Sequence, residues 1–379
     1  MILETEARIA LGGEAIAHAP DGRVVFVTGA APEEQVEVEI TEDTRRFLRA
    51  RVVRVVRPGA ARVDPRCKHF AVCGGCALQH LDGAVQREAK NQAFIETLRR
   101  IGRVDPGAIV VEPPWGGAVY GYRSRTRLAF DRGRLGYRAK KSNAIVDVGE
   151  CPILAPALEA AVLRTRLAIP SRARGEVELM LAGDHVIANS DVELGPIEGV
   201  VFTPEASDFR QSNLPGNDAL IETIESWLTP PFQRSVIELY AGSGNLTRSL
   251  AKSAKSVLAV EASRAPLARA VLPSHVDRRA QAAERAVSEL VRAGARFDAA
   301  LADPPRTGLD ATLPAGLAKL GIEALLMVSC DPATFARDVA RLAQQGLHLT
   351  RARLFDFYPQ TGHAEVAGYF ALVGPGSGG

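Results

Sequence analysis

The sequence lacks the features that would place the chain in a membrane or outside the cell. No apolar run among its 379 residues approaches the roughly 18 residues that a membrane-spanning helix needs. The amino-terminal stretch, MILETEARIALGGE, carries acidic residues and has no basic segment followed by an apolar one, so it does not predict a secretory signal. The five cysteines are an odd number, which argues against a secreted disulfide framework. We therefore expect a soluble, cytoplasmic protein with no membrane partner.

Lysine is also scarce, and arginine carries most of the positive charge. Only seven of the 46 basic residues are lysine, and the net charge of the whole chain is +2. Between residues 44 and 141, however, 22 Lys and Arg stand against 7 Asp and Glu. Such an excess indicates a polyanion such as nucleic acid as the partner of this segment, whereas an Arg-rich solvated surface is the other explanation. The sequence gives no evidence of a protein partner.

The first 58 residues predict a small β-barrel. Five short stretches of alternating apolar and polar residues are separated by Gly and Pro turns, which is typical of an OB-type barrel. The last stretch, RRFLRARVVRVVR, places Arg on one face and Val or Leu on the other. That pattern is expected of a strand that contacts a phosphate backbone, and equally of an ordinary edge strand.

After the barrel the sequence pattern becomes mixed. Residues 61–81 form a cysteine-rich loop, and residues 84–102 have the periodicity of a helix. Residues 119–150 alternate like antiparallel strands, with Arg123, Arg125 and Arg127 on one face. From about residue 233, strands and helices alternate, which predicts a parallel, doubly wound α/β sheet. We expect a multidomain α/β protein with a barrel (1–60), a central basic α+β domain (61–205) and a doubly wound domain (206–379).

The segment around residue 240 predicts a site for a nucleoside cofactor. LYAGSGN ends an apolar strand in a small-residue turn, where Gly242 and Gly244 let a ligand approach the backbone. Glu261 closes the next strand, where a carboxylate can accept hydrogen bonds from a ribose diol. The full dinucleotide fingerprint is missing, so S-adenosylmethionine, which has no phosphates, fits better than a dinucleotide.

Three residues near the ends of later strands suggest a catalytic site. Asp303 in ADPPR and Cys330 in VSCDP each follow an apolar strand, and ligands in such sheets bind outside the carboxyl ends of the strands. Asp303 could instead cap a turn, and Cys330 could be an inert core thiol. Glu365, at the start of the last strand, could be a base. Together they could methylate uracil: the thiolate adds to C6, C5 attacks the methyl group, and the base removes the C5 proton.

The remaining cysteines suggest a metal or cluster site. Cys67-x5-Cys73-x2-Cys76, with Cys151 much later in the chain, supplies four thiolates. Four cysteines can bind zinc or a [4Fe–4S] cluster, and the spacing alone slightly favours zinc. The C-x3-C-x2-C run of radical S-adenosylmethionine enzymes is absent, which argues against that chemistry.

Taken in order, these motifs resemble those of the RNA uracil-C5 methyltransferase family over nearly the whole chain. The amino-terminal segment is similar to the TRAM domain, an OB-like RNA-binding module. CKHFAVCGGCALQHL with the later GECP resembles the iron–sulfur motif of the family, which changes the expected group from zinc to a [4Fe–4S] cluster. DFRQSN, LYAGSGN, VE, DPPR, SCDP and HAE are similar to the motifs of its Rossmann-like catalytic domain.

The resemblance also implies a role for individual residues. It makes Cys330 the nucleophile and Glu365 the proton acceptor, and it assigns the cluster to Cys67, Cys73, Cys76 and Cys151. It implies that S-adenosylmethionine is contacted by Gln211, Tyr240, Asn245, Glu261 and Asp303.

The sequence departs from the pattern of the family at three positions. Arg210 replaces an aromatic residue, Ala241 replaces a cysteine and Asp331 replaces an asparagine. An acidic Asp331 beside the nucleophile would tend to raise the pKa of the thiol.

The resemblance predicts an enzyme that makes 5-methyluridine in RNA, acting on a base that leaves its stack. Family members with both a TRAM domain and a cluster resemble the bacterial 23S rRNA enzymes, whereas the bacterial tRNA enzyme resembles the catalytic part alone. Ribosomal RNA is therefore favoured over tRNA. The rival from another class is a non-catalytic RNA-binding or assembly protein, and the joint presence of Cys330, Glu365 and Asp303 argues against it.

Overall fold

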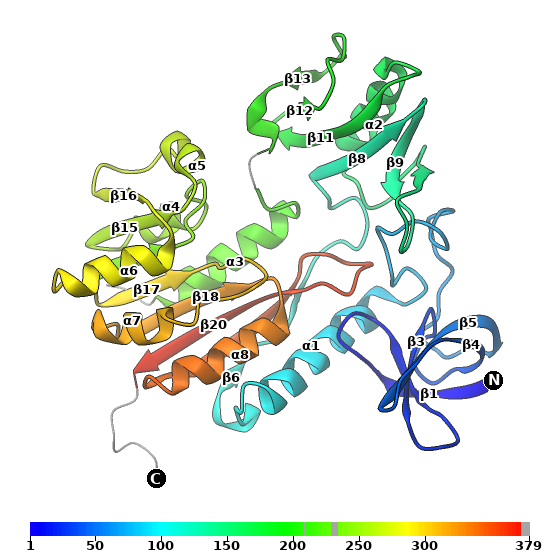
Figure 1. Ribbon diagram of the computed structural model, residues 1–379, viewed down its shortest axis with the longest axis horizontal. Coiled ribbons are helices and arrows are strands. Elements are labelled where there is room, and N and C mark those ends of the chain that lie inside the picture. The colour runs from blue at the N-terminus through cyan, green and yellow to red at the C-terminus, as the bar shows by residue number, and fades with distance from the viewer. Residues whose placement is uncertain (208–209, 229–233, 373–379) are drawn as a thin grey trace. The chain divides into compact units, whose positions relative to one another are not determined.

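The computed structural model describes residues 1–207, 210–228 and 234–372 (Figure 1). Within them, no helix is long and apolar enough to cross a membrane. The chain forms two compact units, each made of several segments. The first unit comprises Met1–Ala93, Gly116–Pro215 and Asp356–His363, and the second comprises Phe94–Trp115, Gly216–Phe355 and Ala364–Gly379.

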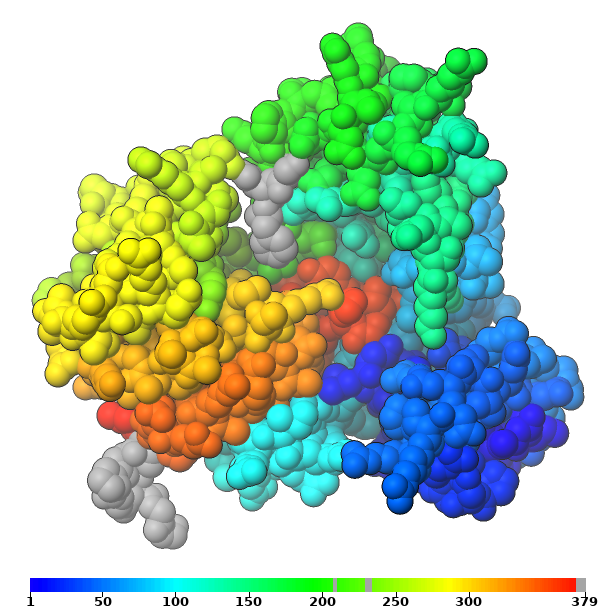
Figure 2. All heavy atoms as spheres, viewed as in Figure 1, coloured from blue at the N-terminus to red at the C-terminus, as the bar shows by residue number. Residues whose placement is uncertain are grey.

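The amino-terminal strands of the first unit close into a barrel, as the sequence predicts. The strand order is β1-β2-β3-β5-β4, and alternate side chains point inward, so Val25, Val27 and Val36 are fully buried. The outer side chains of β4 and β5 form part of the blue surface in Figure 2. The strands are β1 (Ile2–Ile9), β2 (Ala15–His18), β3 (Val24–Thr28), β4 (Gln35–Asp43) and β5 (Phe47–Arg57).

The rest of the first unit is built around a six-stranded sheet with the order β10-β9-β8-β11-β12-β13. Apolar side chains of helix α2 pack into its core, among them Leu158 and Ala161, neither of which is exposed to solvent. The elements are β8 (Arg125–Asp131), β9 (Arg134–Arg138), β10 (Ile145–Asp147), α2 (Pro156–Ala168), β11 (Arg174–Ala182), β12 (His185–Ser190) and β13 (Val200–Phe202). A short 3-10 helix follows at Pro204–Ser207.

Helix α1 (Gly83–Arg100) contributes residues to both units, because the boundary between them falls after Ala93. Its carboxyl-terminal part brings Phe94 and Leu98 into the core of the second unit, where the ring of Phe94 meets that of Phe335 edge to face. A 3-10 helix (Pro106–Ala108) and the short strands β6 (Val110–Val111) and β7 (Trp115–Gly116) follow it.

The second unit contains the predicted doubly wound sheet, with the order β16-β15-β14-β17-β18-β20-β19-β6 and β7 paired to β19. Its strands are β14 (Ser235–Leu239), β15 (Ser256–Glu261), β16 (Val276–Ala280), β17 (Ala299–Ala302), β18 (Ala324–Ser329), β19 (Leu347–Asp356) and β20 (Glu365–Leu372). Its helices are α3 (Leu214–Trp227), α4 (Thr247–Leu250), α5 (Arg264–Arg269), α6 (Ala283–Arg292), α7 (Leu313–Lys319) and α8 (Pro332–Ala343).

The far end of this sheet differs from the predicted parallel arrangement. Strands β14 to β18 are parallel, but β20 is antiparallel to both β18 and β19. Strands β16 and β19 were not predicted, and β19 forms a hairpin with β20. A connection as short as residues 357–364 can join only antiparallel neighbours, since a parallel pair needs a crossover of a dozen or more residues.

Candidate active site and cysteine cavity

The sheet brings the two predicted catalytic residues, and Asp303, which is predicted to contact the cofactor, to one edge of the second unit. Asp303 follows β17 and Cys330 follows β18, so both lie at carboxyl ends of adjacent parallel strands. Glu365 begins β20, which is antiparallel to β18 with Ser329 opposite Val366. Extending this register by one residue, forward from Ser329 and back from Val366, places Cys330 opposite Glu365.

Burial and negative charge dominate the electrostatics of this edge. Burial raises the pKa of Glu365, which is 3% exposed, well above its ordinary value, and the neighbouring Asp303 raises it further. Burial also raises the pKa of Asp303 to about 6. The pKa of the Cys330 thiol is raised by burial and then by Glu365, while the Arg306 guanidinium partly offsets both. The edge thus combines a half-buried thiol with two carboxyl groups of high proton affinity.

Asp331 does not act on the thiol in the way that the sequence suggested. Its carboxylate caps helix α8 and accepts a hydrogen bond from the Thr334 N–H at 2.7 Å. The groups that raise the pKa of Cys330 are Glu365 and Asp303 instead. Asparagine is an equally good helix cap, so the replacement preserves the local structure.

The glycine turn after β14 has the shape expected of a ligand cradle. Gly242 and Gly244 have φ angles of +55° and +79°, and a Cβ at Gly242 would meet no chain atom within 4 Å. The Glu261 carboxylate accepts hydrogen bonds from the N–H groups of Gly242, at 2.9 Å, and Ser263, at 2.7 Å. Each carboxylate oxygen has a second lone pair, so these bonds leave capacity for a ribose diol.

The other predicted cofactor residues occupy different environments. Tyr240 adopts a φ of +64° at the entry to the turn, and burial raises the pKa of its hydroxyl to about 12. The Asn245 side chain is engaged with Asn217 of α3, to which its Nδ2 donates at 2.7 Å. Gln211 belongs to the first unit, and its buried Oε1 has no hydrogen-bond partner among the described residues. Asp208 and Phe209 of the DFRQSN motif lie outside the described residues.

Sequence reasoning missed one buried carboxyl group close to this edge. Glu238 lies within β14 and is 2% exposed, and burial raises its pKa to about 8. Its Oε2 has no partner in the described part of the chain, and Asp303 is close enough to raise its pKa further. The available signal was a lone charged residue inside the apolar strand SVIEL.

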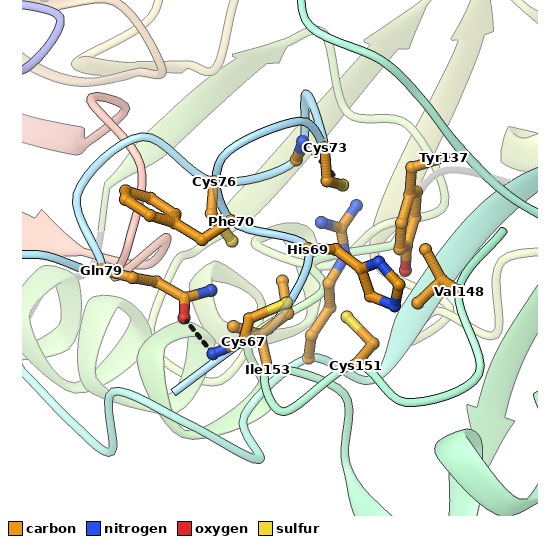
Figure 3. A pocket seen from close by; sticks show the side chains of 12 residues that line it. Cys67, His69, Phe70, Cys73, Cys76, Gln79, Tyr137, Val148, Cys151 and Ile153 are labelled. Carbon is orange, nitrogen blue, oxygen red and sulfur yellow. Dashed lines mark hydrogen bonds between the residues drawn. The ribbon is translucent and has the colours of Figure 1, made fainter. Parts of the chain in front are cut away.

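The four remaining cysteines line one small cavity of the first unit (Figure 3). The Gly75 N–H lies 3.4 Å from the Cys73 sulfur, and Tyr137 forms a hydrogen bond with Cys151. Burial raises the pKa of the Cys151 thiol to about 11. His69 also lines the cavity, and its buried Nε2 has no partner among the described residues.

The geometry of these thiols does not define a site for a single metal ion. Among the residues that the structure describes, no group of three or more His, Cys, Asp or Glu side chains is placed to hold one ion. Sulfurs bound to one tetrahedral zinc would lie about 3.8 Å apart. In a [4Fe–4S] cluster each cysteine binds a different iron, so the sulfurs surround a larger volume. Of the predicted cluster site, the described residues show the four thiols around one shared cavity.

A second, larger cavity of about 630 Å³ lies beside the cysteine loop in the first unit. The ammonium group of Lys140 stands 4.8 Å from the centre of the Phe70 ring. Glu176 also lines this cavity and pairs with two of its arginines, at 3.7 and 3.6 Å. The basic residues of the lining are Arg127, Arg138, Lys140 and Lys141.

The arginines of β5, which the sequence placed on one face, are paired with glutamates. Arg54 meets Glu37 at 3.1 Å and Arg57 meets Glu4 at 3.3 Å, while Arg51 pairs with Glu39. These side chains remain largely exposed, and exposed ion pairs contribute little free energy. The guanidinium groups can therefore exchange a carboxylate for a phosphate at small cost.

Two family models match the sequence. Residues 8–53 match the TRAM domain, and residues 285–371 match a model described as tRNA (Uracil-5-)-methyltransferase. The first match lies on the barrel, and the second includes Asp303, Cys330 and Glu365.

Curated relatives match nearly the full length of the chain. A 23S rRNA (uracil(1939)-C(5))-methyltransferase from Aeromonas hydrophila is 31% identical, over 92% of this chain and 91% of its own. The protein of the same description from Dichelobacter nodosus is 34% identical, over 91% of this chain and 93% of its own.

Among solved structures, the fold is similar to that of the Pyrococcus abyssi tRNA (uracil-54, C5)-methyltransferase in complex with S-adenosyl-L-homocysteine. The TM-score is 0.74 at 21% identity, and the match covers 97% of this chain and 100% of that one. At this identity the likeness establishes the fold.

Proposed function

The chain belongs to the family of 23S rRNA uracil-C5 methyltransferases, and from this premise we propose how its own residues methylate RNA. The methyl donor is S-adenosylmethionine, and the product is 5-methyluridine in 23S rRNA. The relatives act by name on uracil 1939, and we propose the equivalent uridine as the target. The observation that carries the proposal is the meeting of Cys330, Asp303 and Glu365 at one edge of the sheet.

Cys330 is the nucleophile and Glu365 the proton acceptor in this proposal. The Cys330 thiolate adds to C6 of uracil, and the electron pair that moves to C5 would take the methyl group of the donor, with S-adenosylhomocysteine as the thioether that leaves. Glu365 then takes the C5 proton, C5 and C6 regain their double bond, and the bond from C6 to sulfur breaks. The raised pKa of Glu365 supports this role, because a carboxylate of high proton affinity is the stronger base once it is ionised.

In this proposal four residues of the second unit hold the cofactor: Tyr240, Asn245, Glu261 and Asp303. The open space at Gly242 and the free lone pairs of Glu261 are consistent with a nucleoside ligand. When bound, the donor supplies a methyl group on a positively charged sulfonium. That charge favours the ionised forms of Asp303, Glu365 and the Cys330 thiol, and so counters the raised pKa values of the three groups.

The four cysteines Cys67, Cys73, Cys76 and Cys151 hold a [4Fe–4S] cluster in this proposal. Their shared cavity and the N–H group directed at the Cys73 sulfur support it, because clusters are tuned by such hydrogen bonds. The cluster would order the loop of residues 61–81. Anaerobically purified protein should contain about four iron atoms and four sulfides per chain, and stoichiometric zinc would overturn the assignment.

RNA contacts are assigned to the basic part of the chain. We propose that residues 1–60 act as an RNA-binding domain, residues 61–205 as a central basic domain, and residues 206–379 as the methyltransferase domain. The cavity lined by Lys140, Lys141 and Phe70 suits an unstacked base and its phosphate. An rRNA-modifying enzyme of this kind works in the cytoplasm.

The test is methyl transfer to unmodified total RNA, followed by separation of ribosomal from transfer RNA and nucleoside mass analysis. Label in 5-methyluridine of the large ribosomal RNA is the expected result. Label in tRNA would support the proposed chemistry but show that tRNA is the substrate in place of rRNA. A Cys330→Ala variant should bind RNA without methylating it, and residual methylation by that variant would overturn the mechanism.

A further inference from the structure

The loop that joins β19 to β20 is bound at four successive backbone carbonyls. Phe355 pairs with Glu365 as the last pair of the hairpin, and the hairpin loop comprises residues 357–364. The Asn213 side chain donates to the Phe357 carbonyl at 2.9 Å, and the Tyr122 hydroxyl donates to the Pro359 carbonyl at 3.0 Å. Loops usually leave such carbonyls to water, so this density of donors needs an explanation.

Helix α1 and the cysteine loop supply the other donors. Lys90 donates to the Tyr358 carbonyl at 3.1 Å and to the Asp356 carboxylate at 2.6 Å. The N–H groups of Ala77 and Leu78, which directly follow Cys76, donate to the Gln360 carbonyl at 2.8 and 2.9 Å. Segments far apart in the sequence thus converge on one short loop.

Gln360 is the best-fixed residue of the loop. It is 2% exposed and has a φ of +72°, in the left-handed region that a residue with a side chain occupies only when its surroundings enforce it. Its N–H donates to Gln86 Oε1 at 2.8 Å, and Gln86 Nε2 donates to Gln360 Oε1 at 2.9 Å. Gln86 and Lys90 lie four residues apart on α1 and so share one helix face.

We propose that these donors position Glu365 for removal of the C5 proton, an inference that rests on the proposed role of Glu365. We call them the loop clamp: Ala77, Leu78, Gln86, Lys90, Tyr122 and Asn213. Only Ala364 separates the loop residues of the first unit from Glu365. A base must come within about 3 Å of the proton it takes, so a small displacement of the hairpin loop slows this step. The clamp residues are positioning residues, because they act through the loop.

Loss of a clamp contact should slow the removal of the C5 proton and leave the earlier steps of the reaction unchanged. After methyl transfer, Cys330 is still bonded to C6, and C5 carries both the new methyl group and its proton. Glu365 removes this proton, the C–H electron pair forms the C5–C6 double bond, and the C6–S electrons return to Cys330. When proton removal is slow, the covalent RNA–protein adduct accumulates and can be seen on a denaturing gel.

The test compares adduct levels in full-length variants given unmodified rRNA and S-adenosylmethionine. Gln86→Met keeps the side-chain length and removes both amide hydrogen bonds to Gln360. We expect about tenfold slower turnover and about tenfold more adduct, with the rate of adduct formation and the KM for S-adenosylmethionine unchanged. Tyr122→Phe, which removes a single hydroxyl, should show the same pattern with an effect of about threefold.

Two controls separate this inference from the function on which it rests. Val25→Ala opens a cavity in the barrel core of the first unit, a cluster that contains no clamp residue, so it should lower stability and leave the adduct at the wild-type level. Glu365→Gln should trap the adduct most strongly. Failure of Glu365→Gln to trap it would overturn the role of Glu365. Trapping by Glu365→Gln, with Gln86→Met and Tyr122→Phe behaving like Val25→Ala, would overturn the clamp alone.

Discussion

Two buried carboxyl groups, one in each unit, have opposite electrostatic environments. Glu34, next to the barrel strand β4, has no exposed surface, and Glu365 is 3% exposed. Burial raises the pKa of Glu34, but its pairing with Arg62 and hydrogen bonds from the Ala31 and Gly59 N–H groups outweigh burial, so its pKa is lowered. At Glu365 burial acts together with Asp303, and its pKa is raised.

The partners of a buried carboxylate decide whether it stabilises or destabilises the folded chain. Glu34 is satisfied by a cation and two backbone donors, so it stabilises the folded chain. At Glu365 the Arg306 guanidinium, and at the nearby Glu238 the Thr247 hydroxyl, offset burial only in part. Both carboxyl groups therefore cost stability, and a fold retains such groups where their proton affinity serves chemistry. Glu34→Gln should therefore lower the stability of the folded chain, whereas Glu365→Gln should leave it unchanged or raise it.

The largest effect is expected for Glu365→Gln. Turnover should fall by about 10³-fold, because general bases typically contribute between about 10² and 10⁴. The urea midpoint should stay the same or rise, since the amide removes a buried charge that Asp303 opposes. Single-turnover kinetics and urea denaturation measure the two effects. A clear fall of the midpoint would mean that Glu365 is a structural residue like Glu34.

Glu34→Gln should have the opposite effect, on stability. Loss of the carboxylate leaves Arg62 without its partner and weakens two backbone bonds, which should cost about 2 kcal/mol. Urea denaturation measures this change, and Arg62→Gln with the double variant gives the coupling between the two residues. A cost below about 0.5 kcal/mol would contradict the comparison.

The contribution of Glu34 should also depend on pH in a defined direction. Because its folded pKa is lowered, the stabilisation is fully present above the ordinary value of 4.5 and is lost as the pH falls through the lower folded value. The stability difference between wild type and Glu34→Gln should therefore shrink below about pH 4.5. Urea curves from about pH 3 to about pH 7 test this, and a constant difference would refute it.

A smaller effect of pH is expected on cofactor binding through Asp303. Its pKa is raised to about 6, so the group is ionised above that pH and becomes neutral below it. Binding of a sulfonium cation should weaken as the pH falls below about 6, by up to about tenfold per pH unit. Titration calorimetry should show this slope in wild type and its loss in Asp303→Asn. A slope that persists in the variant would assign the effect to another group.

The smallest effect is expected for Glu4→Gln. This variant removes an exposed ion pair, in contrast to the pair between the buried Glu34 and Arg62. Glu4 meets Arg57 at 3.3 Å, and its side chain is 69% exposed. Exposed pairs contribute at most about 1 kcal/mol and commonly less, so the urea midpoint should scarcely move. A loss of stability as large as that expected for Glu34→Gln would show that exposed and buried ion pairs contribute equally to stability.

The sequence predicted most of the fold, because apolar periodicity reports local structure directly. The barrel strands and the strands β14, β15, β17 and β18 were identified in this way. Strands β16 and β19 were missed, and with β19 the antiparallel direction of β20. Periodicity marks which side chains are buried but carries no information on strand direction, which follows here from the short hairpin loop.

Those residues of the candidate site that directly follow apolar strands could be predicted from the sequence. Asp303 and Cys330 were found because carboxyl ends of parallel strands meet at one edge. Glu238 and Asn217 were not, since their environment depends on burial and on a contact between α3 and the glycine turn. The bond between Gln86 and Gln360 spans 274 positions, and no local pattern could reveal it.

The segmented make-up of the first unit has a consequence for how the chain is synthesised. The barrel is encoded within the first 57 residues and can close while translation continues. The hairpin loop, which satisfies Gln86 and Lys90, emerges only near residue 363. Until then the nascent chain lacks both acceptors of Lys90, the Asp356 carboxylate and the Tyr358 carbonyl, so the first unit reaches its final state only after residue 363 has been synthesised.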